Sequence, residues 1–313
     1  MDKLISVVMA TYNGEKFLKE QLESLLNQTY KNLEIIICDD CSNDKTIEII
    51  EIYQKKDTRI KLYQNKENLG VLKNFEKAIF LSQGDYIAIS DQDDIWKLDK
   101  IEILINSIGD SLLIYHDDYL MDKNGKIISH SFFNSNEIKI DIHHNIKSIL
   151  LDNWILGHAC MFSAELKKYI LPIDIRVEHY DMWIAIVAIQ FGTIRFMDKS
   201  LVYWRQHGDN SSGNKLENRN LFQKVFIPID TNTYLQWNKK RIERLEFFNN
   251  VDFLSSYKYF VNDAINYYSL EYRFKAFIFS LKNINYIIQK KGILRKIKYI
   301  FLPLVAPKVD KNC

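Results

Sequence analysis

Several features of membrane, exported and nucleic-acid-binding proteins are missing from this 313-residue chain. No apolar run reaches the ~20 residues that span a bilayer. No signal-peptide pattern precedes the first apolar segment, so we expect a cytoplasmic protein. Acids and bases nearly cancel, with a formal net charge of +2, which argues against nucleic acid as a partner. With only 4 Pro and 10 Gly, the chain has little linker sequence.

Cysteine is also scarce, with four residues in all. Cys38 and Cys41 form a C-x-x-C pair, but no second Cys or His pair follows at the spacing of a zinc site. Cys38 also lies within an apolar run typical of a buried strand. We therefore expect reduced thiols rather than disulfides or structural zinc.

The first hundred residues alternate between short apolar runs and amphipathic segments. The runs predict strands at residues 4–10, 33–38, 59–64 and 86–89, and the segments between them predict helices at 15–27, 45–55 and 71–83. Alternation of this kind predicts an α/β fold with a mostly parallel sheet covered by helices on both faces. In such sheets, ligands bind beyond the carboxyl ends of the strands.

Polar residues follow each of these strands. They are Thr11-Tyr12-Asn13, Asp39-Asp40, Asn68 with Gly70, and Asp91-Gln92-Asp93-Asp94. Because parallel strands end at the same edge of a sheet, we expect the four clusters to lie close together. Such convergence is improbable for four unrelated loops.

The acidic cluster at residues 91–94 leaves two interpretations open. Carboxylate oxygens suit Mg²⁺ or Mn²⁺, which could in turn carry a diphosphate. A solvated acidic turn that caps the following helix is the alternative. For a nucleoside diphosphate, Asp39 or Asp40 could accept the N3–H of a pyrimidine, and Tyr12 could stack on the base.

Beyond residue 100 the pattern is less regular. We expect helices at 97–108, 145–152 and 180–191, strands at 111–115, 159–163, 193–197 and 201–204, and a polar loop at 205–213. Asp181, near the start of an apolar helix, is either a general base or an ordinary first-turn acid. In the loop, Arg205 could bind phosphate and His207 phosphate or a metal, unless both are simply solvated.

Three N-terminal motifs together carry a family resemblance. Residues 6–13 (Ser-Val-Val-Met-Ala-Thr-Tyr-Asn), 39–46 (Asp-Asp-Cys-Ser-Asn-Asp-Lys-Thr) and 90–96 (Ser-Asp-Gln-Asp-Asp-Ile-Trp) resemble, in order and spacing, the family 2 inverting glycosyltransferases of the GT-A fold. Two weaker matches follow, at residues 180–183 (Tyr-Asp-Met-Trp) and 203–210 (Tyr-Trp-Arg-Gln-His-Gly-Asp-Asn). The resemblance covers roughly residues 3–213.

This resemblance implies roles for the matching positions. Thr11, Tyr12 and Asp39 would hold the nucleotide base, and Asp91 and Asp93 would form the D-x-D motif that binds Mn²⁺ or Mg²⁺. Asp181 would deprotonate the acceptor hydroxyl for in-line attack, with inversion at the sugar. We also expect His207 to be a metal ligand. The remaining candidates for the donor site are Asn13, Asp40, Asn68, Gly70 and Arg205.

Departures from the family pattern limit the kinds of sugar transfer that we expect. The Gln-x-x-Arg-Trp signature of processive synthases is absent, which favours transfer of a single sugar. The Ser-Asp-Gln-Asp-Asp-Ile-Trp form is similar to that of bacterial rhamnosyl, O-antigen and capsule transferases. It suggests a dTDP-rhamnose donor, and UDP-hexoses and UDP-N-acetylhexosamines stay equally open. The acceptor would be a hydroxyl of a lipopolysaccharide, capsule or lipid-linked glycan.

Two alternatives belong to other classes of protein. One is a sugar-nucleotide-binding module without activity, against which the acids Asp93 and Asp181 argue. The other is a nucleotidyltransferase, which usually carries a Gly-rich phosphate loop after the first strand. Residues 10–14 (Ala-Thr-Tyr-Asn-Gly) do not form such a loop.

The C-terminal third is expected to be helical, basic and aromatic. We expect a catalytic domain at residues 1–213, with donor-binding (1–100) and acceptor-binding (101–213) halves, and a helical region at 214–313. Residues 290–308 interleave basic and apolar side chains, typical either of a helix on an anionic membrane or of an ordinary packing helix. Aromatic residues between 257 and 272 would form a core face or a homodimer contact.

Overall fold

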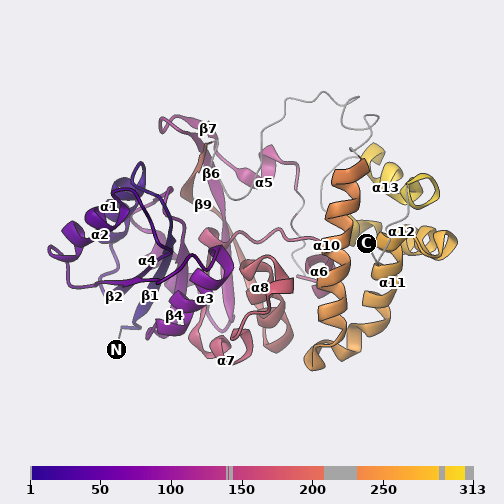
Figure 1. The fold of residues 1–313 in the computed structure, drawn as a ribbon, viewed down its shortest axis with the longest axis horizontal. Helices are drawn as coiled ribbons and strands as arrows, with labels where there is room; N and C mark the ends of the chain where they lie inside the picture. Colours follow the sequence, from indigo (N-terminus) through magenta and orange to yellow (C-terminus); the bar gives the residue numbers. More distant parts are fainter. Residues whose placement is uncertain (1, 139, 141–143, 208–230, 289–292, 307–313) are drawn as a thin grey trace. The chain divides into compact units, whose positions relative to one another are not determined.

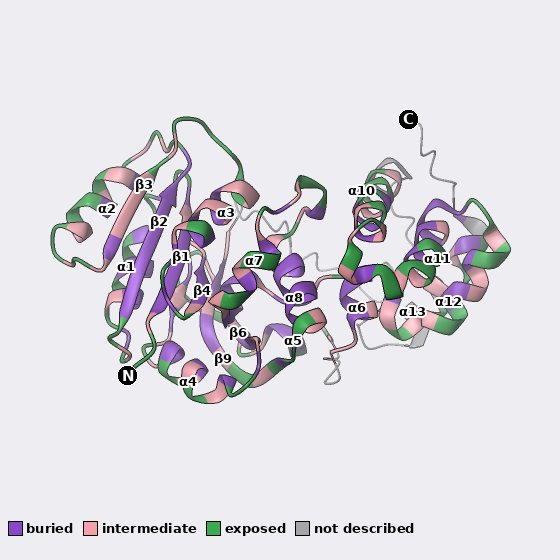
Figure 2. Ribbon diagram, turned by 90° about the horizontal axis from the view of Figure 1, so that it is seen from below, coloured by how far each residue is buried: buried purple, intermediate pink, exposed green. Residues whose placement is uncertain are grey.

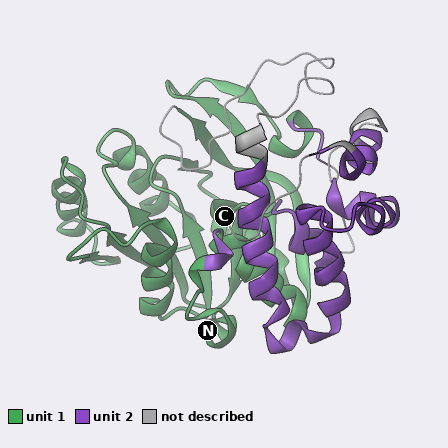
Figure 3. Cartoon of the chain, turned by 45° about the vertical axis from the view of Figure 1, so that its right-hand side comes forward, with its two compact units in different colours: residues 1–135, 155–175, 179–207 green, residues 136–154, 176–178, 208–313 purple. Residues whose placement is uncertain are grey.

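The chain folds into two compact units, coloured separately in Figure 3. The computed structural model describes residues 2–138, 140, 144–207, 231–288 and 293–306. Unit 1 comprises residues 1–135, 155–175 and 179–207, and unit 2 comprises 136–154, 176–178 and 208–313. The expected domain boundary between residues 213 and 214 falls outside the described residues, so the assignment of the two domains stays a prediction.

Unit 1 begins with four parallel strands. They are β1 (Ile5–Thr11), β2 (Leu33–Asp39), β3 (Ile60–Gln64) and β4 (Tyr86–Ser90), in the spatial order β3-β2-β1-β4. Three helices join them: α1 (Leu18–Leu26), α2 (Thr46–Gln54) and α3 (Val71–Leu81). The β-branched residues that fill β1 and β2 suit strands buried on both faces. The alternation predicted from the sequence is thereby confirmed (Figure 1).

The sheet continues beyond β4 in a mixed arrangement. β8 (Cys160–Ser163) runs antiparallel to β4 and to β6 (Leu113–Asp122), whereas β6 and β9 (Ile194–Gln206) are parallel. β5 (Ile95–Trp96) pairs with β9, and β7 (Ile127–Ser129) forms a hairpin with β6. The remaining helical segments of this part are α4 (Lys100–Ile108), α5 (Phe132–Ser135), η1 (Gly157–Ala159), η2 (Ala164–Leu166), α7 (Lys167–Ile170) and α8 (Tyr180–Phe191). The short helix η3 (Ile175–Val177) begins in unit 1 and ends in unit 2.

Several predicted bounds were wrong for identifiable reasons. α1 begins at Leu18 rather than at residue 15, because the amides of Phe17 and Leu18 both donate to the Gly14 carbonyl in a turn. The two strands expected at 193–197 and 201–204 are one strand, β9, which also includes Arg205. Its extra residues are absorbed by register shifts against β6 around Asp117, as in a β-bulge.

Strand β6 is twice as long as expected. The prediction stopped it at residue 115, because a polar run, 116–118, follows. Those side chains are nevertheless buried, and β6 continues to Asp122. A buried polar run is tolerable only where it finds polar partners, and these come from other parts of the chain, as described below.

The core of unit 1 lies between the strands and their covering helices, and Figure 2 shows β1 and β2 as almost continuously buried. Leu18, Leu22 and Leu25, one face of α1, share this core with Trp96 and apolar residues of β1 and β2. Helix α8 is apolar nearly all round, and its residues 182–188 are all buried. The helix that carries Asp181 is therefore a fixed part of unit 1.

The secondary-structure elements that the structure describes in unit 2 are helices. It contains α6 (Ile146–Leu151), α10 (Thr231–Asn249), η4 (Asp252–Tyr257), α11 (Lys258–Ser269), α12 (Arg273–Ile287) and α13 (Ile293–Val305). Consecutive helices from α10 to α13 pack on one another. Tyr267 and Tyr268 of α11 are buried, so part of the aromatic run faces the core of the unit. Among the described residues, no helix is both long and apolar enough to cross a bilayer.

Candidate active site

The strand ends bring the predicted polar clusters to one edge of the sheet. Thr11, the last residue of β1, is in register with Asp39, the last residue of β2. On the other side of β1, Met9 is in register with Ser90, so the acidic cluster starts one residue beyond the end of β4. The clusters that follow β1, β2 and β4 therefore lie on neighbouring strands at their carboxyl ends.

Asp39 is held rigidly at this edge. Its carboxylate accepts hydrogen bonds from Thr11 Oγ1 (2.8 Å), the Ser42 amide (2.9 Å) and Ser42 Oγ (2.6 Å), and the residue is almost fully buried. These donors fix the carboxylate orientation. Thr11 therefore acts on the site through Asp39 and the fold around it.

Asp40 organises the loop that contains two other candidates. Its carboxylate accepts from the amides of Leu69 and Gly70, both at 2.8 Å, and its carbonyl accepts from Asn68 Nδ2 at 3.2 Å. Gly70 has a φ of 80°, which favours glycine. Asp40, Asn68 and Gly70 thus form one mutually bonded loop structure beside Asp39.

The loop after β1 presents Tyr12 to solvent. The Tyr12 side chain is 48 % exposed, whereas its backbone is fixed by Gln92, whose amide accepts from Tyr12 N (3.0 Å) and donates to Tyr12 O (3.1 Å). Asn13, at a φ of 47°, accepts from the Asn43 amide at 2.9 Å. A Cβ on Gly14 would lie 2.3 Å from Gln92 Oε1, so a larger residue there would displace the Gln92 amide from Tyr12.

The acids of the cluster have different environments. Asp93 Oδ2 lies 2.8 Å from His207 Nε2, and both side chains are partly accessible. Asp94 is fully buried and accepts from the Arg205 amide at 3.0 Å, and burial raises its pKa well above the usual value. Asp91 is the most open of the three, with its side chain 35 % exposed.

Arg205 lies in strand β9 and not in the expected polar loop at 205–213. The residue is 2 % exposed. Its guanidinium donates to Glu20 Oε2 (2.6 Å) and, through Nε, to the Asp93 carbonyl (2.9 Å), and it stacks on Phe17. Phe17 also contacts the His207 ring, at 5.1 Å between centroids. Arg205 therefore supports the turn that carries Asp93 and the position of His207.

A second polar cluster, which the sequence did not indicate, lies directly behind Asp91. His158 of η1 places Nδ1 3.1 Å from Asp91 Oδ2 and Nε2 3.2 Å from Asp118 Oδ2. Burial opposes a charge on this ring, but the carboxylates of Asp118 and Asp94 hold its pKa well above the ordinary value. Burial raises the pKa of Asp118. It lowers the pKa of Lys100 to about 7, and the Lys100 side chain donates to the His158 carbonyl.

The donor atoms present could hold a divalent cation in either of two ways. Ligand bonds of ~2.1 Å at right angles place adjacent donor atoms about 3 Å apart, close to the 2.8 Å between Asp93 Oδ2 and His207 Nε2. A second set, Asp91, Asp94 and His158, has donor atoms within 4.8 Å of one another. The first set is accessible and the second is largely buried, so only the first suits an ion that also carries a ligand from solution.

Asp181 lies in the first turn of α8, as predicted, and its Oδ1 accepts from the Met182 amide at 2.7 Å. Its neighbour Tyr180 is buried. Burial, followed by the negative charges of Asp91 and Asp181, raises the pKa of the Tyr180 phenol well above 10. Because both acids act on this one phenol, Asp181 and the acidic cluster belong to the same region of unit 1.

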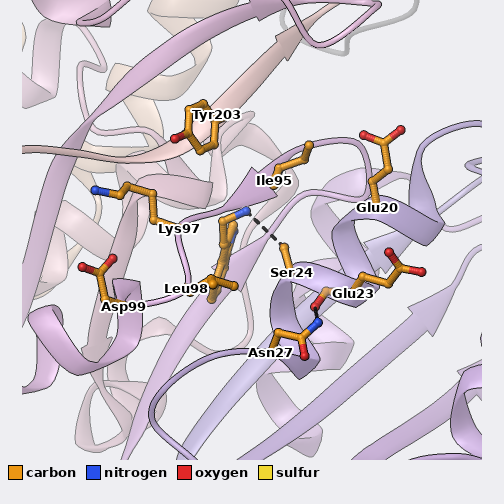
Figure 4. Close-up of a pocket in the computed structure, with 10 residues that line it drawn as sticks. Glu20, Glu23, Ser24, Asn27, Ile95, Lys97, Leu98, Asp99 and Tyr203 are labelled. Carbon is orange, nitrogen blue, oxygen red and sulfur yellow. Dashed lines mark hydrogen bonds between the residues drawn. The ribbon is translucent and has the colours of Figure 1, made fainter.

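A surface groove of about 730 Å³ lies elsewhere on unit 1, along α1 and β5. Figure 4 shows the side chains that line it, among them Glu20, Glu23, Lys97 and Tyr203. None of the residues predicted to bind donor or metal lines this groove. The chemistry is concentrated at the strand ends, and we assign the candidate site there.

Comparisons with known proteins identify the family of the chain. Residues 6–162 match the model of glycosyl transferase family 2. An uncharacterized glycosyltransferase of Methanocaldococcus jannaschii is 34% identical, over 83% of this chain and 87% of the relative. The Escherichia coli enzyme WfaP, a UDP-Glc:α-D-GlcNAc-diphosphoundecaprenol β-1,3-glucosyltransferase, is 31% identical over 69% of this chain and 82% of its own.

Solved structures show the same fold. The mannosyltransferase PcManGT of Pyrobaculum calidifontis, in complex with GDP-Man and Mn²⁺, superposes with a TM-score of 0.58 at 13% identity and covers 97% of this chain and 87% of that one. The architecture is thus the GT-A fold expected from the resemblance, with a mostly parallel sheet flanked by helices. The chain belongs to glycosyl transferase family 2 and is a glycosyltransferase.

Proposed function

We propose that this enzyme transfers one sugar, with inversion and with the aid of a divalent metal ion, from a nucleoside diphosphate sugar to a hydroxyl of a surface glycan. The observation that carries the proposal is the meeting of Asp39, Tyr12 and the acidic cluster at the ends of three neighbouring strands. This edge offers an aromatic ring and a fixed carboxylate for a base, and accessible carboxylates for a metal-bound diphosphate.

Each part of the donor finds complementary chemistry. The exposed Tyr12 ring provides a stacking surface, and the rigid Asp39 carboxylate can accept an N–H from a pyrimidine. Asn13 and the loop of Asp40, Asn68 and Gly70 shape the pocket around Asp39. A uracil or thymine nucleotide fits this arrangement, and UDP-glucose, the donor in the name of the relative WfaP, is the first to test.

The residues that would hold Mn²⁺ or Mg²⁺ are Asp93 and His207, together with Asp91. The chemistry that such an ion supplies when bound is Lewis-acid stabilisation of negative charge on the departing diphosphate. Arg205 contributes indirectly, by bonding the Asp93 carbonyl and stacking on Phe17 beside His207. These contacts hold the accessible pair in place before any ligand arrives.

Asp181 is the proposed general base. Its position in the first turn of the buried helix α8 stabilises the ionised carboxylate through the positive end of the helix dipole. Deprotonation of the acceptor hydroxyl there lets the oxygen attack the anomeric carbon in line with the leaving diphosphate. One displacement inverts the configuration and needs no covalent enzyme intermediate.

A panel of nucleotide sugars tests the function directly. In the presence of Mn²⁺, the protein is expected to release nucleoside diphosphate slowly from one donor among UDP-glucose, UDP-N-acetylglucosamine, UDP-galactose and dTDP-rhamnose. A coupled assay for the released diphosphate detects turnover, and EDTA should abolish it. Binding of a nucleotide sugar without turnover, even with glycan acceptors added, would instead support the inert module.

We also propose peripheral contact between the C-terminal helices and the inner face of the cytoplasmic membrane, which suits a lipid-linked acceptor. Residues 273–309 contain no acid and the following bases: Arg273, Lys275, Lys282, Lys290, Lys291, Arg295, Lys296, Lys298 and Lys308. Exposed apolar side chains accompany them, with Phe274 73 % and Phe301 50 % exposed. A basic surface that also carries exposed apolar side chains complements an anionic bilayer.

Vesicle sedimentation tests this contact. The protein is expected to sediment with phosphatidylglycerol-containing vesicles and not with pure phosphatidylcholine. Replacing Lys275, Lys282 and Lys296 by Gln should weaken binding roughly 100-fold, because each lysine contributes about 1 kcal/mol near an anionic surface. Equal binding to both vesicle types, or no effect of the triple substitution, would contradict the proposal.

The homodimer contact expected for the aromatic residues between 257 and 272 stays a prediction.

A further inference from the structure

The buried ring of His158 is clamped between two carboxylates. It is 3 % exposed, with Asp91 Oδ2 3.1 Å from Nδ1 and Asp118 Oδ2 3.2 Å from Nε2. Each ring nitrogen thus faces an acceptor, and an imidazole can donate to both only when both nitrogens carry a proton.

The ring is fixed independently of Asp91. The His158 carbonyl accepts from the Lys100 ammonium at 2.6 Å, and that ammonium lies 3.5 Å from the centroid of the buried Trp96 ring. Trp204 packs against the imidazole, with centroids 5.1 Å apart. His158 is therefore a rigid donor, and Asp91 is the partner whose side chain reaches towards solvent.

Asp91, Asp94 and His158 could alternatively ligate a second metal ion through an unprotonated Nδ1. Burial lowers the pKa of the neighbouring Lys100 to about 7, so the charge of Lys100 does not decide between the two arrangements. The number of Mn²⁺ ions bound per chain distinguishes them.

We propose that His158 is a positioning residue of the donor site, which fixes the Asp91 carboxylate through Nδ1–H while Asp118 fixes the ring from its opposite side. The inference rests on the proposed function, in which Asp91 helps to hold the metal-bound diphosphate. It adds a residue that touches neither metal nor donor and acts through Asp91.

The test measures Mn²⁺ binding to the full chain in the presence of UDP or dTDP, by the electron paramagnetic resonance signal of free Mn²⁺. The wild type is expected to bind one Mn²⁺ per chain. His158→Ala should weaken this binding about 10- to 100-fold, the usual effect of removing a residue that orients a metal ligand. His158→Gln, which keeps one donor, should recover part of the loss, and Asp118→Asn should give a smaller loss.

His116→Ala is the matched control. His116 is also buried, and its Nδ1 contacts the Asp117 carbonyl at 2.7 Å rather than Asp91, although it lies 3.5 Å from Asp118 Oδ1 as well. This variant should lower the melting temperature and change Mn²⁺ affinity less than twofold. If His158→Ala does not fold, His158→Gln and Asp118→Asn provide the same comparison.

Three results would overturn the inference. The first is unchanged Mn²⁺ affinity in the His158 variants, and the second is an equal loss of Mn²⁺ affinity in His116→Ala. The third is binding of two Mn²⁺ per wild-type chain with one of them lost in His158→Ala, which would make His158 a metal ligand. Failure of the proposed function can be distinguished from failure of the His158 inference alone. If the proposed function is wrong, the wild type itself binds no Mn²⁺ with either nucleotide. In that case the role of His158 fails with it.

Discussion

Replacing Asp93 by Asn is expected to lower the rate of sugar transfer about a thousandfold, or ~4 kcal/mol, because an ionised metal ligand is lost. The substitution preserves size, and the Asn carbonyl can still accept from His207 Nε2, so the fold should survive. Calorimetric titration with UDP, with and without Mn²⁺, should show that the enhancement of nucleotide binding by the metal has disappeared.

Asp122→Asn is a suitable control for this experiment. Asp122 lies in the β6–β7 turn, where its carboxylate accepts from the amides of Asn124 and Lys126, roles that Asn can keep. This variant should bind and transfer as the wild type does. Undiminished Mn²⁺-dependent binding of UDP by Asp93→Asn would remove Asp93 from the metal site.

Replacing Asp181 by Asn should separate binding from chemistry. A general base contributes typically 10²- to 10⁴-fold, so we expect transfer to fall about a thousandfold. Donor affinity should change less than threefold, because Asp181 has no role in donor binding. Single-turnover transfer and UDP titration on the same preparation provide the two measurements.

Glu178→Gln is the comparison for Asp181. Glu178 is the next acid along the chain, and its carboxylate lies 3.3 Å from Lys240 Nζ and 3.4 Å from Arg244 Nη1. Because the Glu178 carboxylate already pairs with two cations, an acceptor hydroxyl would have to compete with them for it, so this variant should keep most of the activity. If Asp181→Asn retained transfer and Glu178→Gln lost it, the base would be Glu178.

The parts of the fold that the sequence predicted are those where local pattern and tertiary environment agree. β1 and β2 are runs of apolar, largely β-branched residues, buried on both faces, and such runs have few alternatives. The predicted edge of polar residues follows from them, because parallel strands place Thr11 and Asp39 side by side. Local sequence was sufficient for these features.

The second half of unit 1 was harder to predict, because its polar residues are satisfied over long distances. Asp117 is buried in β6 and accepts from the amides of Phe132 and Phe133, and Asp118 faces His158, 40 residues away. Periodicity gives no sign of such pairs. For the same reason Arg205, on β9, was expected in a polar loop, since its partner Glu20 lies 185 residues earlier.

His158 gave no usable signal in the sequence. It sits in a short apolar stretch, residues 154–162, without a recognisable motif. A lone histidine in such a stretch is usually a core residue. Only the meeting of η1 with the end of β4 and the middle of β6 reveals the carboxylates on both sides of the ring.

Gln92, the middle residue of the D-x-D motif, makes two binding determinants thermodynamically interdependent. Its side-chain amide pairs with both backbone groups of Tyr12, so the turn carrying Asp91 and Asp93 and the loop after β1 move as one piece. A ligand that displaces one must displace the other. The changes in binding free energy caused by substitutions at Tyr12 and at Asp93 should therefore not add. A double-mutant cycle between these two residues, measured once with Gln92 and once with Gln92 replaced, gives the coupling energy.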